Sequence, residues 1–322
     1  MLELRIGIIG SGYIAGKFAD ERPLFTEGAG ISCVYNPRIA GAEGFAEKYG
    51  IEKVARDRDE LFRESDIVYI ASPHASHAAY AKEALLAGRH VLCEKPMAFR
   101  RAEAEELYSE AGKRGLILME GIKPACCPGF IALCDAVSSG IIGDIVDIEA
   151  SFVRGAGADS KIWSDPENGG SLYELGSYTL FPLVRFMHGS DCTVRFDSVF
   201  SENGVDRYTK TYLSFEEKFG LSKTGLGAES EGSLIITGTD GYIKATAPWW
   251  HPDRFELFRK GEDPELFVFP CDGYALSYEL NELVSRIREG RTEGMGVKPH
   301  ESTAIADIME KFRNWKEEKT EC

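Results

Sequence analysis

Apolar residues in the first third of the chain form short continuous runs, with helical stretches between them. The runs lie at residues 4–9, 31–35, 54, 66–71, 90–93 and 116–119. Helical spacing covers residues 39–49, 77–87 and 102–113. Apolar strands that alternate with crossover helices predict a parallel sheet covered by helices on both faces.

The pattern changes after residue 121. Helical spacing covers residues 130–138, a stretch ending near residue 188, and the segments 275–287 and 302–315. Alternating apolar and polar residues lie at 145–154, 193–200, 208–215, 232–237, 242–247, 255–259 and 266–269. Such alternation predicts a mainly antiparallel sheet with one open face. We therefore expect two domains, residues 1–122 and 123–322, with the C-terminal helices packing back on the first domain.

Length and charge narrow the class of protein. The 322 residues suffice for two domains, and 37 basic residues against 52 acidic ones give a formal net charge of −15. Such a surface repels nucleic-acid backbones and anionic membranes, so neither is expected as a partner. The N-terminal apolar run is broken by glycine and lacks a basic segment, which predicts a buried strand and a cytoplasmic protein. The eight cysteines contain no CxxC pair, which predicts reduced thiols and no metal site.

A glycine-rich turn follows the first predicted strand. Residues 10–15 read GSGYIA and stand between an apolar run and a helical stretch. In this context the first glycine permits a tight turn, and the second lets the backbone approach a pyrophosphate. The next helix then offers its first N–H groups to the phosphates. We predict a Rossmann dinucleotide-binding domain in which NAD or NADP is bound by Gly10, Ser11, Gly12, Tyr13 and Ile14.

The end of the second predicted strand bears on the choice between NAD and NADP. An acidic residue there would bind the ribose hydroxyls of NAD. This chain instead has Asn36, which brings no charge to repel a 2′-phosphate, and Arg38, which could pair with one. The alternative for Arg38 is a solvated side chain on the next helix. Both residues are expected to bind the cofactor, and they favour NADP.

A loop after the fourth predicted strand lies at the sheet edge where ligands bind in open α/β sheets. It contains Ser72, Pro73, His74 and His77, all expected near the cofactor. For His77, anchoring of the loop is favoured over catalysis.

The next loop at this edge contains Glu94 and Lys95, followed by a proline. Both residues are expected at the cofactor. An ammonium near the nicotinamide could stabilise a developing alkoxide. The alternative for Lys95 is an ordinary solvated lysine.

Residues 169–178 read GGSLYELGSY, with Glu174 and Tyr178 four residues apart. On a helix, this spacing places the carboxyl and the phenol one turn apart on one face. Taken alone, the pair is also compatible with an ordinary amphipathic surface. Gly169 and Gly170 predict room for substrate and chain to approach the cofactor.

Together these motifs resemble one family. GSGYIA, SPHASH, HVLCEKPMA and GGSLYELGSY are similar to segments of the Gfo/Idh/MocA oxidoreductases, named for glucose–fructose oxidoreductase and inositol dehydrogenase. The resemblance implies an N-terminal Rossmann domain and a C-terminal α/β domain with an open-faced sheet. It also implies a bound NAD(P) and a homodimer or homotetramer formed through that sheet.

The resemblance further implies roles for individual residues. Lys95 is implied as catalytic, and Tyr178 as the proton donor or acceptor, as in the tyrosine-containing dihydrodiol and xylose dehydrogenase-like branch of the family. The ammonium of Lys95 would favour the phenolate of Tyr178. Glu174 stands where aspartate is usual and is expected to bind the substrate.

Two more residues are expected at the substrate. Family members of the tyrosine branch often carry an arginine near Ala125, and Lys123 is expected to supply that cation here. Trp163 is expected either to stack on a sugar face or to pack in the domain.

These expectations predict an NAD(P)-dependent oxidoreductase that transfers a hydride between the nicotinamide and a sugar, polyol or related hydroxy or carbonyl compound. One alternative is an NAD-dependent glycosidase on the same fold, which shows no net cofactor turnover. The other is a non-catalytic dinucleotide-binding sensor. The presence of both Lys95 and Tyr178 argues against the sensor, which has no need of the pair.

Overall fold

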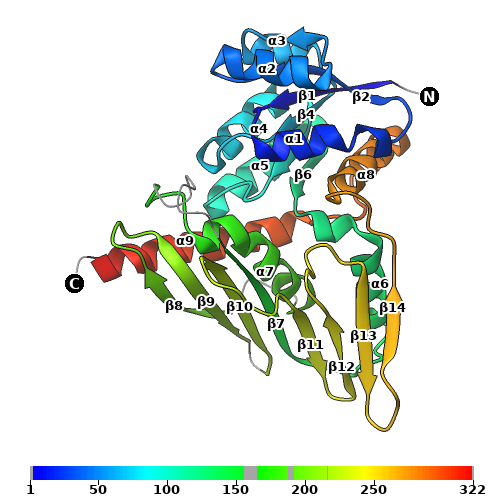
Figure 1. Ribbon diagram of the computed structural model, residues 1–322, viewed down its shortest axis with the longest axis vertical. Helices are drawn as coiled ribbons and strands as arrows, with labels where there is room; N and C mark the ends of the chain where they lie inside the picture. Colours follow the sequence, from blue (N-terminus) through cyan, green and yellow to red (C-terminus); the bar gives the residue numbers. More distant parts are fainter. Residues whose placement is uncertain (1–2, 156–164, 188–191, 216, 321–322) are drawn as a thin grey trace. The chain divides into compact units, whose positions relative to one another are not determined.

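The computed structural model describes residues 3–155, 165–187, 192–215 and 217–320. Its contacts divide the chain into two compact units, each with its own sheet (Figure 1). The first unit comprises Met1–Cys126 and Asp272–Ser302, and the second comprises Cys127–Cys271 and Thr303–Cys322. The first unit thus extends to Cys126, beyond the boundary predicted after residue 122, and residues 272–302 group with it, whereas residues 303–322 group with the second unit.

The first unit contains a six-stranded sheet with the strand order β3-β2-β1-β4-β5-β6. All neighbouring strands are parallel. The strands are β1 (Leu4–Ile9), β2 (Ala29–Tyr35), β3 (Lys53–Val54), β4 (Ile67–Ile70), β5 (His90–Glu94) and β6 (Leu118–Gly121). The helices are α1 (Tyr13–Asp20), α2 (Ile39–Tyr49), α3 (Arg58–Arg63), α4 (His77–Leu86), α5 (Arg101–Arg114) and α8 (Leu276–Glu289). The predicted parallel α/β sheet is confirmed, and its strand order reverses between β1 and β4, where such sheets bind ligands.

The core of this unit forms as the apolar pattern predicts. The strand residues Ile6, Ile8 and Ile67 are fully buried. Helix α2 buries the face that the sequence spacing marks, namely Ala42, Phe45, Ala46 and Tyr49. Helix α8 adds Leu276, Leu280, Leu283 and Val284 to the same core cluster.

Helix α3 was not anticipated from the sequence. It has only six residues, too few to show a helical repeat. It begins after Asp57, whose carboxylate accepts the Glu60 N–H at 2.7 Å and so satisfies a backbone donor of the first turn.

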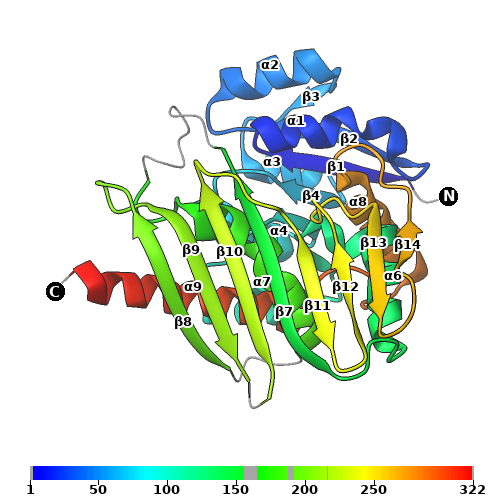
Figure 2. The same ribbon diagram turned by 60° about the horizontal axis from the view of Figure 1, so that its bottom comes forward.

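The second unit contains an eight-stranded sheet with the order β14-β13-β12-β11-β7-β10-β9-β8 (Figure 2). Its strands are β7 (Ile145–Arg154), β8 (Thr193–Phe200), β9 (Asp206–Ser214), β10 (Phe219–Leu226), β11 (Leu234–Gly238), β12 (Gly241–Ala245), β13 (Arg254–Arg259) and β14 (Glu265–Val268). Its helices are α6 (Pro128–Ser138), α7 (Ser171–Met187) and most of α9 (Pro299–Thr320). The pairing is antiparallel except between β7 and β10, which confirms a mainly antiparallel sheet.

Strand β10 was missed by the apolar pattern, because the positions that it buries are small or polar. Gly220, Ser222 and Thr224 face helix α7, and the Thr179 and Ser222 hydroxyl oxygens lie 2.6 Å apart. A Cβ added at Gly220 would lie 2.9 Å from the Leu183 side chain. The close approach of α7 therefore requires small or polar residues at these positions, and such residues give no apolar pattern from which a strand could be predicted.

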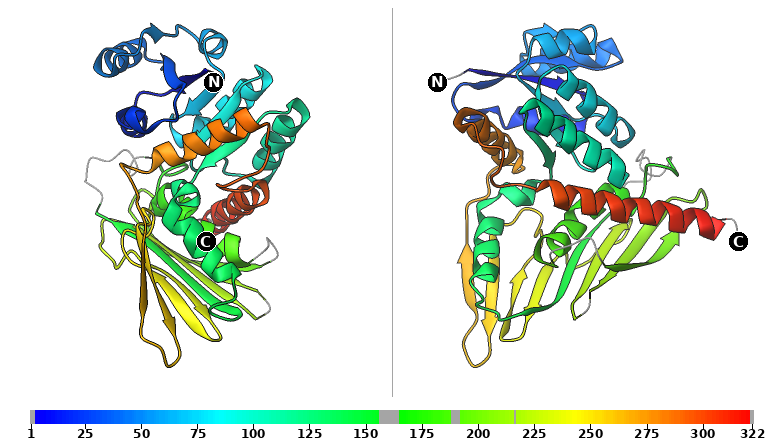
Figure 3. Two further views of the ribbon diagram at one scale, coloured as in Figure 1. Left: turned by 90° about the vertical axis from the view of Figure 1, so that its right-hand side faces the viewer. Right: turned by 180° about the vertical axis from the view of Figure 1, so that it is seen from behind.

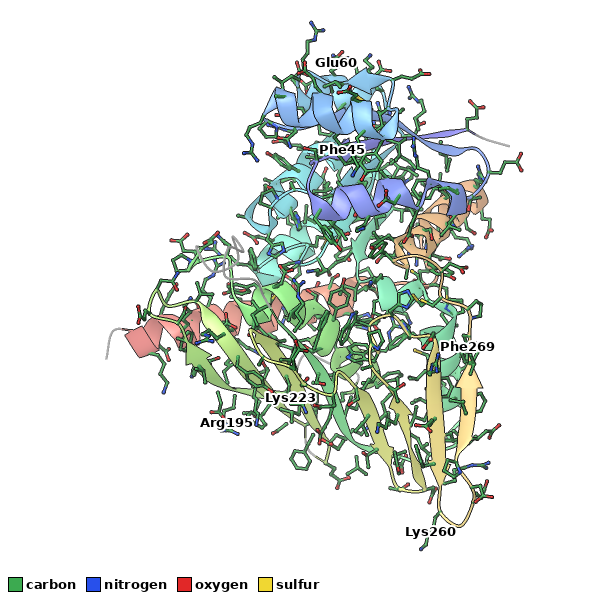
Figure 4. All side chains as sticks on the ribbon, in the orientation of Figure 1. Phe45, Glu60, Arg195, Lys223, Lys260 and Phe269 are labelled. Atoms are coloured by element: carbon green, nitrogen blue, oxygen red, sulfur yellow. The ribbon has the colours of Figure 1, made fainter. Side chains whose placement is uncertain are left out.

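Helix α7 covers one face of this sheet, and α9 lies against the same layer (Figure 3). Phe312 of α9 packs against Tyr173 of α7, with ring centroids 5.9 Å apart. No helix of the described residues covers the opposite face, which includes Arg195 and Lys223 (Figure 4). Phe312 also packs against Phe196 of β8, with ring centroids 5.2 Å apart, so α7 and α9 cover the same face of the sheet side by side.

Two general features complete the fold. In the part of the chain that the structure describes, no helix is long and apolar enough to span a membrane, and no cluster of His, Cys, Asp or Glu could hold a metal ion. None of the seven described cysteines forms a disulfide bond.

Candidate active site

The predicted dinucleotide turn connects β1 to α1. Gly10 has φ +111°, and a Cβ there would lie 2.4 Å from the Ala71 carbonyl oxygen. Gly12 is the N-cap of α1, no side chain caps the helix, and the space beside its Cα holds no atom within 4 Å. The first N–H groups of α1 are thus not occupied by a capping side chain, and the backbone beside Gly12 is accessible, as pyrophosphate binding requires. The residues of the turn fit a dinucleotide.

The end of β2 is joined directly to this turn. The Asn36 amide donates to the Ser11 hydroxyl at 2.6 Å, and its Oδ1 accepts the Arg38 N–H at 2.9 Å. Arg38 is exposed and is the N-cap of α2, which has no capping side chain either. A second helix N-terminus and a cation thus stand beside Asn36.

A cavity of about 310 Å³ extends from the turn along the groove between α1 and α2. Tyr13, which is 76% exposed, and Phe45 of α2 line it, and Phe45 is labelled in Figure 4. Lys17 and Lys48 contribute positive charge to this groove, and Asp20, which also lines it, pairs with Lys17 at 3.8 Å. One positive charge in excess and the ring of Phe45 make the groove compatible with an anionic ligand that has an apolar part.

The loop after β4 is held by a buried histidine. His77 is 1% exposed, and its two ring nitrogens lie 2.8 Å from the Pro96 and Ser72 carbonyl oxygens. The Ser72 and Ser76 hydroxyl oxygens lie 2.7 Å apart, and the His74 ring lies 5.6 Å from that of His77. His77 thus joins the Ser72–Pro73–His74 loop to the loop after β5.

The loop after β5 carries the predicted catalytic lysine. Lys95 follows the last residue of β5 and is only 9% exposed, and the Lys95–Pro96 peptide is cis. Glu94 is buried and accepts the Tyr69 hydroxyl at 2.7 Å. Burial raises the pKa of Glu94, and the hydroxyl of Tyr69 and the ammonium of Lys95 oppose that rise. The solvated alternative for Lys95 does not hold in this structure.

Lys123 follows β6, in a short 3₁₀ turn (Lys123–Cys126). Its ammonium donates to the Tyr274 carbonyl at 2.9 Å. Ala125, two residues further on, is buried. Lys123 therefore has a structural contact within the first unit, besides any role at a substrate.

Helix α7 carries Glu174 and Tyr178 in the second unit. Tyr178 is 9% exposed, and its ring packs against Phe152 with a centroid distance of 5.6 Å. Glu174 forms an ion pair with Arg154, with 3.1 Å between Oε1 and Nη2. Tyr178 is thus a buried phenol, and Glu174 is a carboxylate that is paired with the guanidinium of Arg154.

The N-terminus of α7 is capped by Asp206, which comes from β9. One carboxylate oxygen of Asp206 accepts the Ser171 hydroxyl at 2.6 Å and the Leu172 N–H at 2.9 Å. Burial raises the pKa of Asp206, and these hydrogen bonds oppose that rise. Sequence reasoning missed this residue because it lies far from α7 along the chain.

The interpretation of Gly170 is corrected by Asp206. Gly170 has φ +110°, and a Cβ there would lie 1.9 Å from an Asp206 carboxylate oxygen. The glycine makes room for the capping carboxylate and not for a substrate. Trp163, expected to line the substrate site, lies outside the described residues.

A parallel sheet that carries a glycine turn before an uncapped helix N-terminus defines a dinucleotide-binding Rossmann fold. The family model for the oxidoreductase family with an NAD-binding Rossmann fold matches residues 4–122, and that for the GFO/IDH/MocA C-terminal domain matches residues 130–244. The chain belongs to the Gfo/Idh/MocA oxidoreductase family, and it is an enzyme of the dehydrogenase and reductase class.

Curated relatives align over nearly the whole chain. Trans-1,2-dihydrobenzene-1,2-diol dehydrogenase of Bos taurus is 29% identical, covering 97% of this chain and 96% of its own. The scyllo-inositol 2-dehydrogenase (NADP(+)) IolU of Bacillus subtilis is also 29% identical, covering 96% of both chains.

Solved structures share the fold. The 3-ketoreductase KijD10 of Actinomadura kijaniata, in complex with NADP and TDP-benzene, superposes with a TM-score of 0.80 at 23% identity, covering 95% of each chain. UDP-N-acetylglucosamine 3-dehydrogenase GnnA of Acidithiobacillus ferrooxidans gives 0.81 at 20% identity, covering 98% of each.

Proposed function

We propose that this protein is an NAD(P)-dependent dehydrogenase or reductase that interconverts a hydroxyl and a carbonyl group on a sugar, polyol or related compound. Family membership supports the cofactor class, and the names of the dihydrodiol and inositol dehydrogenase relatives support the substrate class. The observation that carries the proposal is the buried Lys95 at the carboxyl edge of the sheet that also bears the uncapped glycine turn. Lysine side chains are almost never fully buried unless they are paired, because burial removes water from the ammonium group.

In the proposed reaction, Tyr178 transfers the proton of the substrate hydroxyl. The ammonium of Lys95 favours the phenolate of Tyr178 and stabilises negative charge developing on the substrate oxygen. When bound, the nicotinamide accepts or supplies the hydride. The proposal requires that Lys95 of the first unit and Tyr178 of the second act on one substrate.

Substrate binding is proposed for the remaining polar residues. Glu174, which pairs with Arg154, is proposed to accept hydrogen bonds from substrate hydroxyls. Lys123 and Trp163 complete the predicted set of substrate ligands.

The proposal is tested by following NADPH absorbance across a panel of aldoses, polyols and vicinal diols. Net formation or consumption of NADPH with one of them is expected. Substrate hydrolysis without net change in NADPH would instead identify the glycosidase. Tight NADP binding with a wholly inert panel and no hydrolysis would favour the sensor.

NADP is proposed as the preferred cofactor, because Arg38 and the uncapped N-terminus of α2 stand beside Asn36. The Arg38→Ala variant is expected to raise the Kd for NADP+ by about tenfold or more, since a charge-assisted hydrogen bond contributes about 1.5–3 kcal/mol. Its Kd for NAD+ should stay within about twofold of the wild-type value, because NAD+ lacks the 2′-phosphate. The control is Arg63→Ala, which removes an exposed cation at the end of α3. Equal losses for NAD+ and NADP+ in Arg38→Ala would count against a 2′-phosphate contact.

A homo-oligomer is proposed to form through the open face of the second sheet. The strand register places several exposed apolar side chains on this face: Val199, Phe219, Tyr242, Leu266 and Val268. An apolar face of this kind is typical of an interface between subunits. Phe219→Asp is expected to shift the sedimentation coefficient towards that of a monomer. The matched control is Leu86→Asp, at an exposed apolar residue of α4. Unchanged sedimentation of Phe219→Asp would place the interface elsewhere.

A further inference from the structure

One peptide group of the catalytic loop is held from both sides by buried ionisable side chains. It is the Pro96–Met97 peptide, which follows Lys95 directly. Its carbonyl oxygen lies 2.8 Å from Nδ1 of His77, and its N–H donates to Oε1 of Glu120 at 3.0 Å. His77 and Glu120 are 1% and 4% exposed. Neither the apolar pattern nor the motifs singled out Glu120, which lies in β6.

The contacts of His77 bear on its protonation state. Nδ1 faces the Pro96 carbonyl, and Nε2 faces the Ser72 carbonyl at 2.8 Å. A neutral imidazole has one N–H and would turn a lone pair toward one of these oxygens. An imidazolium donates to both. The ammonium of Lys95 disfavours the cation, a backbone hydrogen bond to Glu94 favours it, and the His74 ring lies 5.6 Å from that of His77.

The contacts of Glu120 fit a carboxylate. Its Oε1 accepts the Met97 N–H, and its Oε2 accepts the Ser302 hydroxyl. The Ser302 oxygen in turn accepts the Tyr108 hydroxyl at 2.9 Å. When Glu120 is ionised, the Met97 N–H, the Ser302 hydroxyl and the Tyr108 hydroxyl each have an acceptor in this series of hydrogen bonds. A protonated Glu120 carboxyl would leave the Ser302 hydroxyl hydrogen without this acceptor.

We infer that His77 and Glu120 form an ion pair bridged by the Pro96–Met97 peptide, and that this pair positions Lys95. The role of Lys95 itself rests on the proposed function. Hydrogen bonds on both sides of one peptide group polarise it, so each strengthens the other. His77 and Glu120 are positioning residues, because they act on the backbone next to Lys95.

Burial makes the two charges depend on each other. It lowers the pKa of His77 and raises that of Glu120, so burial favours the neutral form of each group. The ammonium of Lys95 opposes the rise in the pKa of Glu120, and the Glu94 carboxyl adds to it. An uncompensated buried charge is costly, whereas a paired and hydrogen-bonded one is tolerated. Loss of the Glu120 charge should therefore discharge His77 and release one of its two carbonyl contacts.

The first test needs no variant. The full-length chain is labelled with ¹⁵N-histidine, and the His77 resonances are assigned by their absence in His77→Asn. At pH 7, with and without NADP+, both His77 nitrogens are expected to give the chemical shifts of protonated ring nitrogens. One protonated and one bare nitrogen at pH 7 would overturn the ion pair. This readout does not depend on turnover, so it stands apart from the fate of the proposed function.

The second test changes the charge of Glu120 and little of its shape. In Glu120→Gln the amide oxygen still accepts the Met97 N–H, but the negative charge is gone. The His77 titration midpoint should fall to lower pH, and kcat should fall most at alkaline pH, with KM nearly unchanged. Glu120→Asp, which restores the charge, should recover part of the alkaline activity. An unmoved His77 midpoint in Glu120→Gln would contradict the bridge.

The matched control is Glu103→Gln. Glu103 accepts the Phe99 N–H at 3.3 Å, so it contacts the same loop through a backbone amide but does not touch the Pro96–Met97 peptide. It should leave the His77 midpoint in place. If Glu120→Gln does not fold, Ser302→Ala removes one hydrogen bond to the carboxylate and should move the midpoint in the same direction by less. If the Ser302→Ala variant folds normally and its His77 titration midpoint is unchanged, the proposed link from Ser302 through Glu120 to His77 is contradicted.

Discussion

Replacing Tyr178 by phenylalanine is expected to lower kcat by about 10³-fold, within the range that proton-transfer groups contribute. The substitution removes one oxygen and keeps the ring that packs against Phe152. The Kd for NADP+ and the free energy of unfolding should therefore stay close to their wild-type values. Single-turnover absorbance measurements with the substrate found in the panel would separate the chemical step from binding.

The control for this variant lies on the same helix. Tyr173 is 1% exposed, and burial raises the pKa of its phenol. Tyr173→Phe removes a buried hydroxyl of the same kind and should cost about 1 kcal/mol of stability while leaving kcat nearly unchanged. Wild-type turnover by Tyr178→Phe would remove Tyr178 from the reaction. A similar loss of kcat in both variants would point to a general disturbance of α7.

The dinucleotide turn could be predicted from the sequence because its requirements are local. Gly10 and Gly12 stand within three residues of each other, between an apolar strand and a helix, and the tight turn follows from that order alone. The predicted strands of the first unit lie close to the observed ones for the same reason. A strand buried on both faces is apolar throughout, whatever its neighbours are.

The supports of the site could not be predicted, because they depend on residues that only the fold brings together. Asp206 caps α7 from another strand, and Gly170 is a glycine because that carboxylate needs the space. Glu120 reaches Met97 from the neighbouring strand. A lone glutamate in an apolar run carries no signal of such a contact. The sequence therefore predicts the location of the cofactor site, whereas the residues that support the site are identified only from the tertiary structure.

The two glycines of the dinucleotide turn are expected to respond to alanine in different ways. In Gly10→Ala the new Cβ would lie 2.4 Å from the Ala71 carbonyl oxygen at φ +111°. Strain and overpacking of this kind each cost about 1–3 kcal/mol, so the free energy of unfolding should fall by about 3 kcal/mol. NADP+ binding should also be lost, because the loop must move to relieve the contact. Urea unfolding and fluorescence titration with NADP+ measure the two effects.

Gly12→Ala separates cofactor binding from folding. Gly12 has φ −84°, which alanine adopts without strain, and nothing lies within 4 Å of the added Cβ. The free energy of unfolding should therefore be unchanged or slightly higher, since alanine lowers the entropy of the unfolded chain. The Kd for NADP+ should nevertheless rise by about tenfold or more, because the methyl group occupies the space through which the pyrophosphate reaches the first N–H groups of α1. Wild-type affinity for NADP+ in Gly12→Ala would mean that the phosphates do not approach this turn, because a methyl group at Gly12 would obstruct a pyrophosphate bound there.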